Sequence, residues 1–228
     1  MKLGDRIRAA EPPIPANMYL AHIIGVCDLG EQYSDIFKNY SNKLSFTFEI
    51  HGQTHEVGGK IVARDLTKTM SIAGKAGSKC RSFFDGLMNK TLSDEEYKNL
   101  DPFAFIGVPV QVQVVLTEDG QHNNIAAVTP LPPYITNVPA ATLPTFRWDC
   151  DAWDDNAFKD LPAWVQERLA KSTQFQSIHP STDTIAVQPV QPMAQVAHQI
   201  GYQQPVQPVQ PVAQGFSPVE MGGAVIPF

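Results

Sequence analysis

Two runs of alternating apolar and polar residues, the first of them strict, most restrict how this chain can fold. Residues 44–50 read LSFTFEI and residues 110–117 read VQVQVVLT. Successive side chains of a strand point to opposite faces of a sheet. Each run therefore predicts a strand with one face in a core and the other toward polar surroundings. We expect a mainly β fold.

Three further strands are predicted, over residues 19–29, 60–69 and 124–129. Gly25 interrupts the first of them, and an isolated glycine in a strand commonly marks a bulge or a bend. Residues 51–55 predict a turn and Gly58-Gly59 a bulge, and an Asp119-Gly120 turn joins the last two strands. In strand 60–69 we expect Ile61 and Leu66 to face inward.

One helix is predicted between the third and fourth strands, from Lys79 to about Asn89. Ser78 is its expected N-cap, and Cys80, Phe83, Phe84 and Leu87 form its apolar stripe. A second, short helix is expected to open with a capping box at Ser93. The predicted elements follow the connectivity of a five-stranded OB-fold barrel, which is strand, long loop, strand, strand, helix, strand, hairpin and strand.

Composition divides the chain into four parts. Residues 1–17 are rich in proline and predict a flexible arm, and residues 18–133 hold the predicted barrel. Residues 134–172 form an acidic and aromatic segment with a short helix. Residues 173–228 lack Lys and Arg and are dominated by Gln, Pro and Val, so this tail is expected to be disordered.

A cationic stretch stands out in a protein whose formal net charge is −6. Residues 58–81 hold one acid, Asp65, and six basic residues: Lys60, Arg64, Lys68, Lys75, Lys79 and Arg81. The spacing of four places Lys60, Arg64 and Lys68 on one face of a strand. The stretch predicts an anionic partner. A solvated surface is the alternative.

The loop predicted over residues 30–43 carries three aromatic residues, Tyr33, Phe37 and Tyr40, beside Lys38 and Lys43. Two interpretations remain open. The spacing of the rings can place them on one face of a short helix packed on the core. Alternatively, a flexible loop offers them for stacking of nucleic-acid bases.

Residues that would support chemistry or membrane insertion do not form recognisable patterns. Cys27, Cys80 and Cys150 have no metal-ligand spacing, and nothing completes a site around His51 and His55. No metal or other cofactor is predicted, and no triad or carboxylate cluster indicates an enzyme. Residues 18–29 are too short and too polar for a membrane span, so we expect a cytoplasmic protein, in the host cell cytoplasm if a phage encodes it.

Several segments resemble bacteriophage single-stranded-DNA-binding proteins of OB-fold type. They are IGVCDLG at 24–30, the strand with Lys60, the helix around Arg81, IGVP at 106–109, IAAVTPLP at 125–132 and LPAWVQER at 161–168. The resemblance covers residues 18–172 and implies sequence-independent binding and protection of single-stranded DNA, or RNA, in replication and recombination. We expect the six basic residues and Lys43 to contact phosphates and the three rings to stack on bases. The alternative is a structural or protein-interaction module that uses the barrel without nucleic acid, as the pI of 5.4 favours.

The final residues, Val225-Ile226-Pro227-Phe228, are similar to the C-terminal tip of bacterial single-stranded-DNA-binding proteins. That resemblance implies that the tip recruits replication or repair proteins. The bacterial tip follows a run of acids, whereas only Glu220 lies near this one.

The segment after the predicted barrel interleaves Trp148, Trp153 and Phe158 with four aspartates, Asp149, Asp151, Asp154 and Asp155. Asp160 is expected to cap an amphipathic helix with Leu161, Trp164, Val165 and Leu169 on one side. Two interpretations remain open. The segment docks on the barrel for stability, or its acids and rings imitate nucleic acid and compete for the binding groove.

Overall fold

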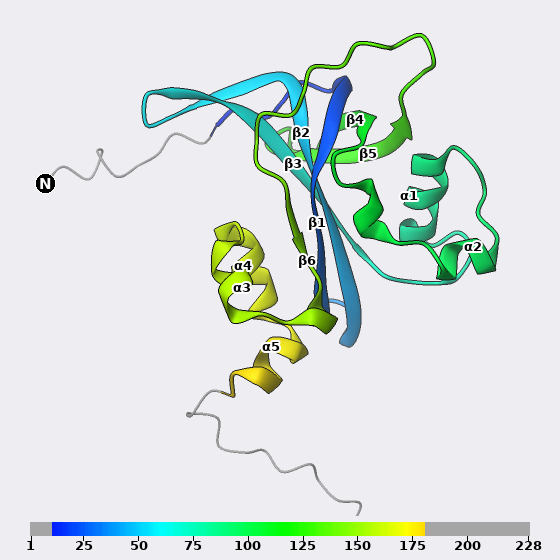
Figure 1. The fold of residues 1–228 in the computed structure, drawn as a ribbon, viewed down its shortest axis with the longest axis vertical. Helices are drawn as coiled ribbons and strands as arrows, with labels where there is room; N and C mark the ends of the chain where they lie inside the picture. Colours follow the sequence, from blue (N-terminus) through cyan, green and yellow to red (C-terminus); the bar gives the residue numbers. More distant parts are fainter. Residues whose placement is uncertain (1–10, 181–228) are drawn as a thin grey trace, which may run out of the picture. The chain divides into compact units, whose positions relative to one another are not determined.

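The computed structural model describes residues 11–180, which fold around one six-stranded sheet (Figure 1). The strands are β1 (Asn17–Ser34), β2 (Asn39–Val57), β3 (Lys60–Ser71), β4 (Pro109–Leu116), β5 (Asn123–Pro130) and β6 (Phe146–Trp148). The first five pair antiparallel in the order β3-β2-β1-β4-β5, and β6 pairs parallel with β1. The prediction of a mainly β fold is confirmed.

The sheet is open rather than closed into a barrel. Strands β3 and β5 form its two edges, and within residues 11–180 no ladder of backbone hydrogen bonds joins them. The two edges nevertheless approach each other, because the Nζ of Lys68 on β3 donates a hydrogen bond to the carbonyl of Ile125 on β5, at 2.6 Å. A side chain, not a strand ladder, spans the position where the predicted barrel would close.

Strand β1 changes neighbours at Gly25. Residues 17–22 of β1 pair with β4 and residues 25–27 pair with β6, and the ladder to β2 shifts register between Ile23 and Gly25. A Cβ at Gly25 would lie only 2.3 Å from the ring of Phe146. The predicted bulge is therefore confirmed, and the absence of a side chain lets β6 lie directly against β1.

The main core lies between the inner face of the sheet and the helical connection from β3 to β4. Alternate residues of β2, Phe46, Phe48 and Ile50, are fully buried and meet Phe83 and Phe84 of α1 (Lys79–Met88). The predicted caps are confirmed: Ser78 Oγ accepts the amide of Arg81, and Ser93 with Glu96 forms the capping box of α2 (Asp94–Lys98). The short helix η2 (Pro102–Phe105) then leads into β4.

Two predicted loops are parts of β-hairpins. Strands β1 and β2 continue through residues 30–43, with a turn over 35–38, so this region is neither the short helix nor the flexible loop that the sequence left open. We call residues 30–43 the β1–β2 arm. Residues 51–55 belong to β2, with a bulge between Ile50 and Thr54, and Gly58-Gly59 forms the β2–β3 turn with positive φ values of 58° and 81°. The prediction that Ile61 faces inward is wrong, because Ile61 follows this exposed turn and is 80% exposed. Leu66 packs on the core as predicted.

Residues after β5 build a second, smaller core on β1. They include η3 (Cys150–Ala152), α3 (Asp155–Asp160), α4 (Ala163–Leu169) and α5 (Thr173–Ile178). Trp148, Val165 and Leu169 are buried against Cys27 and Leu29 of β1. The amides of Thr142 and Leu143 donate to the buried carboxylate of Glu49 on β2, at 2.7 to 2.9 Å. The segment therefore docks on the sheet, in agreement with the interpretation that it packs on the strands.

Three boundaries differ from the predictions. Residues 11–16 were assigned to the flexible arm, but Ile14 is fully buried and its backbone N–H and C=O both bond to the side chain of Asn123. Helix α4 begins after Pro162 without a side-chain cap, so Asp160 is not its N-cap. Helix α5 lies where the tail was predicted to be disordered from residue 173. None of the helices within residues 11–180 is long and apolar enough to cross a bilayer.

Candidate nucleic-acid interface

In the described part of the chain, a groove runs between the two edges of the sheet. Its volume is about 1010 Å³. Residues 67–71 of β3 form one wall, residues 124–129 of β5 form the other, and the start of α1 contributes Ser78, Lys79 and Ser82. The open sheet is the reason that this groove exists, because closure of β3 on β5 would fill it.

The groove carries four cations and, among the described residues that line it, no carboxylate. The cations are Lys43 on β2, Lys68 on β3, Lys79 on α1 and Arg168 on α4. This charge is concentrated in a protein with a formal net charge of −6. Such a concentration of one sign in a concave surface favours an extended anionic ligand.

Lys68 is the most strongly constrained of the four cations. Its Nζ is half-buried and donates to the Ile125 carbonyl. Burial, and then the charge of Lys79, hold the pKa of Lys68 below its ordinary value. A phosphate bound between Lys68 and Lys79 would oppose this shift, because its negative charge stabilises both ammonium groups.

Hydroxyl groups extend the polar surface along β3. Lys43 Nζ donates to Ser71 Oγ at 2.7 Å, and Thr67 Oγ1 lies 3.0 Å from Thr47 Oγ1. Thr67, Thr69 and Ser71 all line the groove, at every second position of the strand. Hydroxyls and lysines together are the groups that commonly contact phosphate and sugar oxygens.

Arg168 reaches the groove from the C-terminal segment, and sequence patterns did not predict it as a site residue. The carbonyl of Arg168 accepts a hydrogen bond of 3.0 Å from Gln32 Nε2 on β1, which ties the end of α4 to the base of the β1–β2 arm. These two residues are 136 positions apart. The only signal for Arg168 was its place in the segment 161–168 that resembles the phage proteins.

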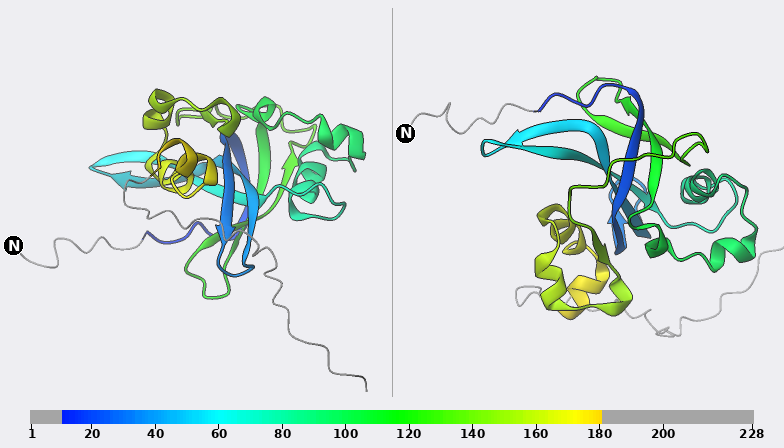
Figure 2. Two further views of the ribbon diagram at one scale, coloured as in Figure 1. Left: turned by 90° about the horizontal axis from the view of Figure 1, so that it is seen from below. Right: turned by 45° about the horizontal axis from the view of Figure 1, so that its top comes forward.

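Four of the predicted phosphate ligands do not line the groove: Lys60, Arg64, Lys75 and Arg81. Lys60 lies at the β2–β3 turn, eight residues from Lys68, which corresponds to about 26 Å along a strand. This hairpin extends from the sheet on the side away from α1 (Figure 2). Arg64 donates to the Pro12 carbonyl at 2.8 Å and lies 4.0 Å from the carboxylate of Glu11.

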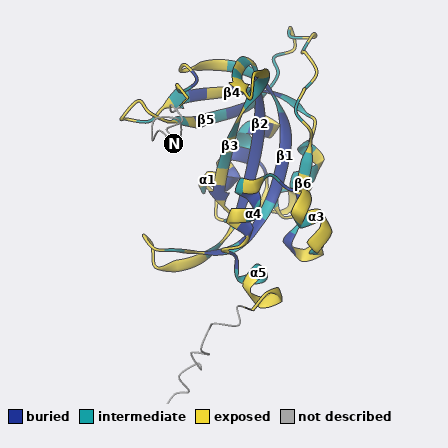
Figure 3. Cartoon of the chain, turned by 90° about the vertical axis from the view of Figure 1, so that its left-hand side faces the viewer, coloured by how far each residue is buried: buried dark blue, intermediate teal, exposed yellow. Residues whose placement is uncertain are grey.

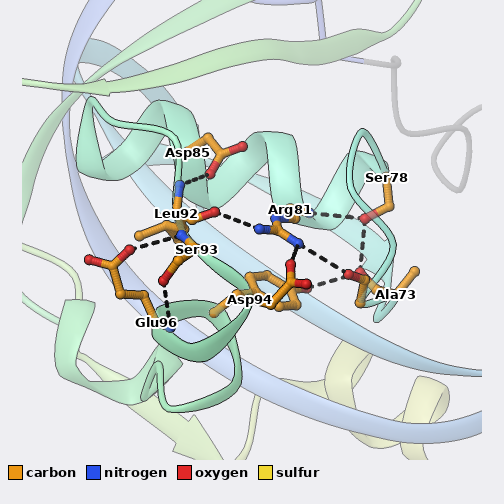
Figure 4. Close-up of polar contacts among 10 residues, drawn as sticks. Ala73, Ser78, Arg81, Asp85, Leu92, Ser93, Asp94 and Glu96 are labelled. Carbon is orange, nitrogen blue, oxygen red and sulfur yellow. Dashed lines mark hydrogen bonds and ion pairs between the residues drawn. The ribbon is translucent and has the colours of Figure 1, made fainter.

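Arg81 is a buried structural residue. Its side chain is 7% exposed, pairs with Asp94, and donates to the carbonyls of Leu92 and Gly74 (Figure 4). The guanidinium holds the pKa of Asp94 below its usual range. These contacts join α1 to α2, and Arg81 is not among the residues that line the groove.

The three predicted stacking rings lie on the β1–β2 arm. Tyr33 and Tyr40 are direct cross-strand partners, 48% and 57% exposed, with ring centroids 5.1 Å apart. Phe37 is 76% exposed at the turn. Figure 3 shows that β1 and β2 are buried within the sheet and exposed toward the arm. Because side chains alternate along a strand, Tyr40 faces the opposite side of the arm from Lys43.

The rings of the acidic segment are occupied by its own core. Trp148 is 3% exposed and packs edge-on against Trp153, with centroids 4.8 Å apart, and Phe158 stacks on Trp153. None of the four aspartates of this segment lines the groove. The packing thus gives no support to the interpretation that acids and rings imitate nucleic acid in the groove.

The histidines considered for a metal site are separated. His51 Nε2 lies 2.7 Å from His22 Nδ1, whereas His55 Nδ1 lies 2.9 Å from Glu11. Within residues 11–180, no three potential metal-ligating side chains are grouped. The proposed partner-binding tip, Val225 to Phe228, lies outside the described residues.

Comparison with models of known protein families, with curated proteins and with solved structures finds no match. The function therefore has to be inferred from the groove and its surroundings.

Proposed function

We propose that this protein binds single-stranded nucleic acid, without sequence preference, along the groove between β3 and β5. One observation carries the proposal: four cations and no carboxylate, among the described residues, line a groove of about 1010 Å³ in an acidic protein. Lys and Arg side chains that contact successive phosphates of a nucleic-acid strand provide affinity that does not depend on base identity.

The groove would hold the sugar–phosphate backbone, with Arg168 and Lys43 near the arm and Lys68 and Lys79 near α1. The hydroxyls of Thr67, Thr69 and Ser71 supply neutral hydrogen bonds to the same backbone. Tyr33 follows Gln32, which lines the groove, and lies with Tyr40 on the opposite face of the arm, so a nucleic-acid strand that leaves the groove has to cross the edge of the arm before its bases stack on these rings. Lys60, Arg64, Lys75 and Arg81 are left out of this contact set because of their positions.

The sequence resemblance supports the same function. The five antiparallel strands and the helix between β3 and β4 have the order of an OB fold, and we propose that the open sheet is a variant of it. The role is non-enzymatic protection of single-stranded DNA during replication or recombination, and the tip at 225–228 recruits partner proteins.

Fluorescence anisotropy with labelled oligo-dT at increasing salt tests the proposal. Neutralisation of about four phosphates on a single strand predicts a log–log salt slope of about −3. Replacing Lys43, Lys68, Lys79 and Arg168 together by Gln should abolish most of the affinity. The matched control replaces Lys60, Lys75, Lys159 and Lys171, which changes the net charge equally outside the groove. Equal losses in both variants, or no binding by the wild type at low salt, would reject the proposal.

A protein-interaction module is the second candidate, and the free edges of β3 and β5 favour it. Both strands lack a strand partner on the groove side within the described residues, and such edges can accept an extended peptide by strand addition. Backbone hydrogen bonding depends little on salt. The oligo-dT titration tests the first candidate alone, and binding of an extended peptide with an affinity that changes little with salt would support the second.

A further inference from the structure

The tip of the β1–β2 arm is an exposed apolar knob on an ordered hairpin. Ile36 is 85% and Phe37 76% exposed. The turn that presents them is held by the amide of Lys38, which donates to the Ser34 carbonyl at 2.7 Å, and by the ladder from Ser34 to Asn39. Two adjacent large apolar side chains at the end of a projecting hairpin indicate a contact with another molecule.

An apolar pocket of about 380 Å³ lies at the root of the same arm. Its walls come mainly from α1, α2 and η2, and include Ile72, Phe84, Tyr97, Leu100 and Phe103. Leu44 of β2 lines it too, so the pocket is on the opposite face of β2 from Lys43 and is separate from the cationic groove. Its charged lining residues are Asp28, Asp149 and Lys98.

We propose that the arm tip of one copy of this protein inserts into the apolar pocket of a second copy. Charges complement each other around the apolar contact: Asp35 and Lys38 flank the knob, whereas Lys98 and the aspartates Asp28 and Asp149 line the pocket. Asp35 would meet Lys98, and Lys38 would meet the aspartates.

The contact is between molecules because the arm cannot fold back. Asp28 at the pocket and Ile36 at the tip are eight residues apart, about 26 Å along a strand. The ladder shifts register between Asp28 and Glu31 and then pairs β1 with β2 from Glu31–Asn42 to Ser34–Asn39, which holds the tip away from its own pocket. Knob and pocket are different surfaces at opposite ends of one element. Copies therefore join head to tail, an arrangement that continues as an open series unless its geometry closes a ring.

The contact is expected to be weak by itself. Two side chains of this size bury on the order of 300 Å², whereas stable interfaces bury about 1,200 to 2,000 Å². Association becomes substantial only when the copies are held close together, as on one nucleic-acid strand. The contact does not depend on the proposed function, but it would make binding to long strands cooperative.

Nuclear magnetic resonance without nucleic acid tests the contact and detects weak binding. An isotope-labelled Ile36→Ser/Phe37→Ser variant has a pocket but no knob, so it can accept one unlabelled wild-type copy and cannot extend the series. Adding unlabelled wild type should shift the amides of Lys98, Leu100 and Phe103. Adding the unlabelled double variant should not. Absence of shifts up to the solubility limit of the wild type would overturn the proposal.

Charge reversal fixes the orientation of the contact. Lys98→Asp in the labelled acceptor should remove the shifts, and Asp35→Lys in the unlabelled donor should restore them. Both residues are exposed, so neither substitution threatens folding. Failure of the reversed pair to restore binding would overturn the assignment of Asp35 to Lys98. Because no nucleic acid is present, these outcomes are independent of the outcome of the oligo-dT titration.

Discussion

Lys68 Nζ on β3 donates a hydrogen bond to the Ile125 carbonyl on β5, so a cation connects the two edges of an open sheet. The half-buried ammonium belongs to the β3 wall of a groove that also holds Lys79, and its pKa is lowered by burial and by that neighbour. A backbone carbonyl supplies only a partial negative charge. A phosphate oxygen is therefore the stronger partner for this ammonium.

Replacing Lys68 by Met should weaken binding to oligo-dT and reduce the salt slope by about 0.7, the amount expected for one phosphate on a single strand. Lys60→Met is the matched control, because Lys60 is on the same strand and face but outside the groove. Anisotropy titrations at several salt concentrations measure both. An unchanged slope for Lys68→Met would show that Lys68 serves only to connect β3 with β5.

Arg168→Gln should lower the affinity for oligo-dT, because it removes the cation that the C-terminal segment contributes. Lys171→Gln, an exposed position three residues further along and outside the groove, should have little effect. If the acidic segment instead competed with nucleic acid, replacing Asp149, Asp151, Asp154 and Asp155 by Asn would increase affinity far more than their loss of charge accounts for. We expect no such increase.

Tyr33→Ala should cost about 1 to 3 kcal/mol of binding free energy if a base stacks on this ring. The control is Tyr134→Ala, since Tyr134 is 82% exposed and does not lie on the arm. Quenching of tyrosine fluorescence on addition of oligo-dT gives a second readout. Equal affinities for both variants would remove the Tyr33–Tyr40 pair from the binding surface.

Arg81→Met should destabilise the fold and leave the groove intact. The substitution leaves the carbonyls of Leu92 and Gly74 without their donor, which should lower the free energy of unfolding by about 1 to 3 kcal/mol. Lys79→Met, two residues earlier in α1, should instead weaken binding to oligo-dT and leave the free energy of unfolding nearly unchanged. Denaturant unfolding and anisotropy on both variants check the assignment, and the opposite pattern would contradict it.

Asp28 should make the stability of the fold depend on pH. Burial, with smaller contributions from Asp151 and Asp149, raises the pKa of Asp28 above its ordinary value, although the Gly30 amide opposes the shift. Between the ordinary value of about 3.9 and the raised pKa, the folded state binds more protons than the unfolded state, so stability falls as the pH increases through this window. As the pH rises through this window, the free energy of unfolding of the wild type should fall relative to that of Asp28→Asn. Above the window, the difference between the two free energies should stay constant. A difference that is constant throughout would contradict the prediction.

Local sequence patterns were sufficient for most strands and for the helix between β3 and β4. The alternation in 44–50 and 110–117 and the caps at Ser78 and Ser93 act over a few residues, so the sequence shows them directly. The β1–β2 arm was missed because residues 30–43 mix polar and large apolar side chains without alternation. Its strands form only because β1 and β2 extend each other's ladder beyond the core.

The candidate site was predicted only in part, because charge counting does not show what each cation contacts. Lys43, Lys68 and Lys79 line the groove, whereas Arg81 is buried against Asp94 and Arg64 contacts Pro12. Arg168 joins them from the C-terminal segment, 89 residues after Lys79.

The sequence by itself determined the mainly β fold, the bulge at Gly25 and the presence of a cationic stretch, since these follow from periodicity, glycine geometry and composition. Only the tertiary structure decided which cations gather and what they surround. The reason is physical: the gap between β3 and β5 depends on where two edge strands stop, and Arg168 reaches it only because α4 packs on Cys27 and Leu29 of β1.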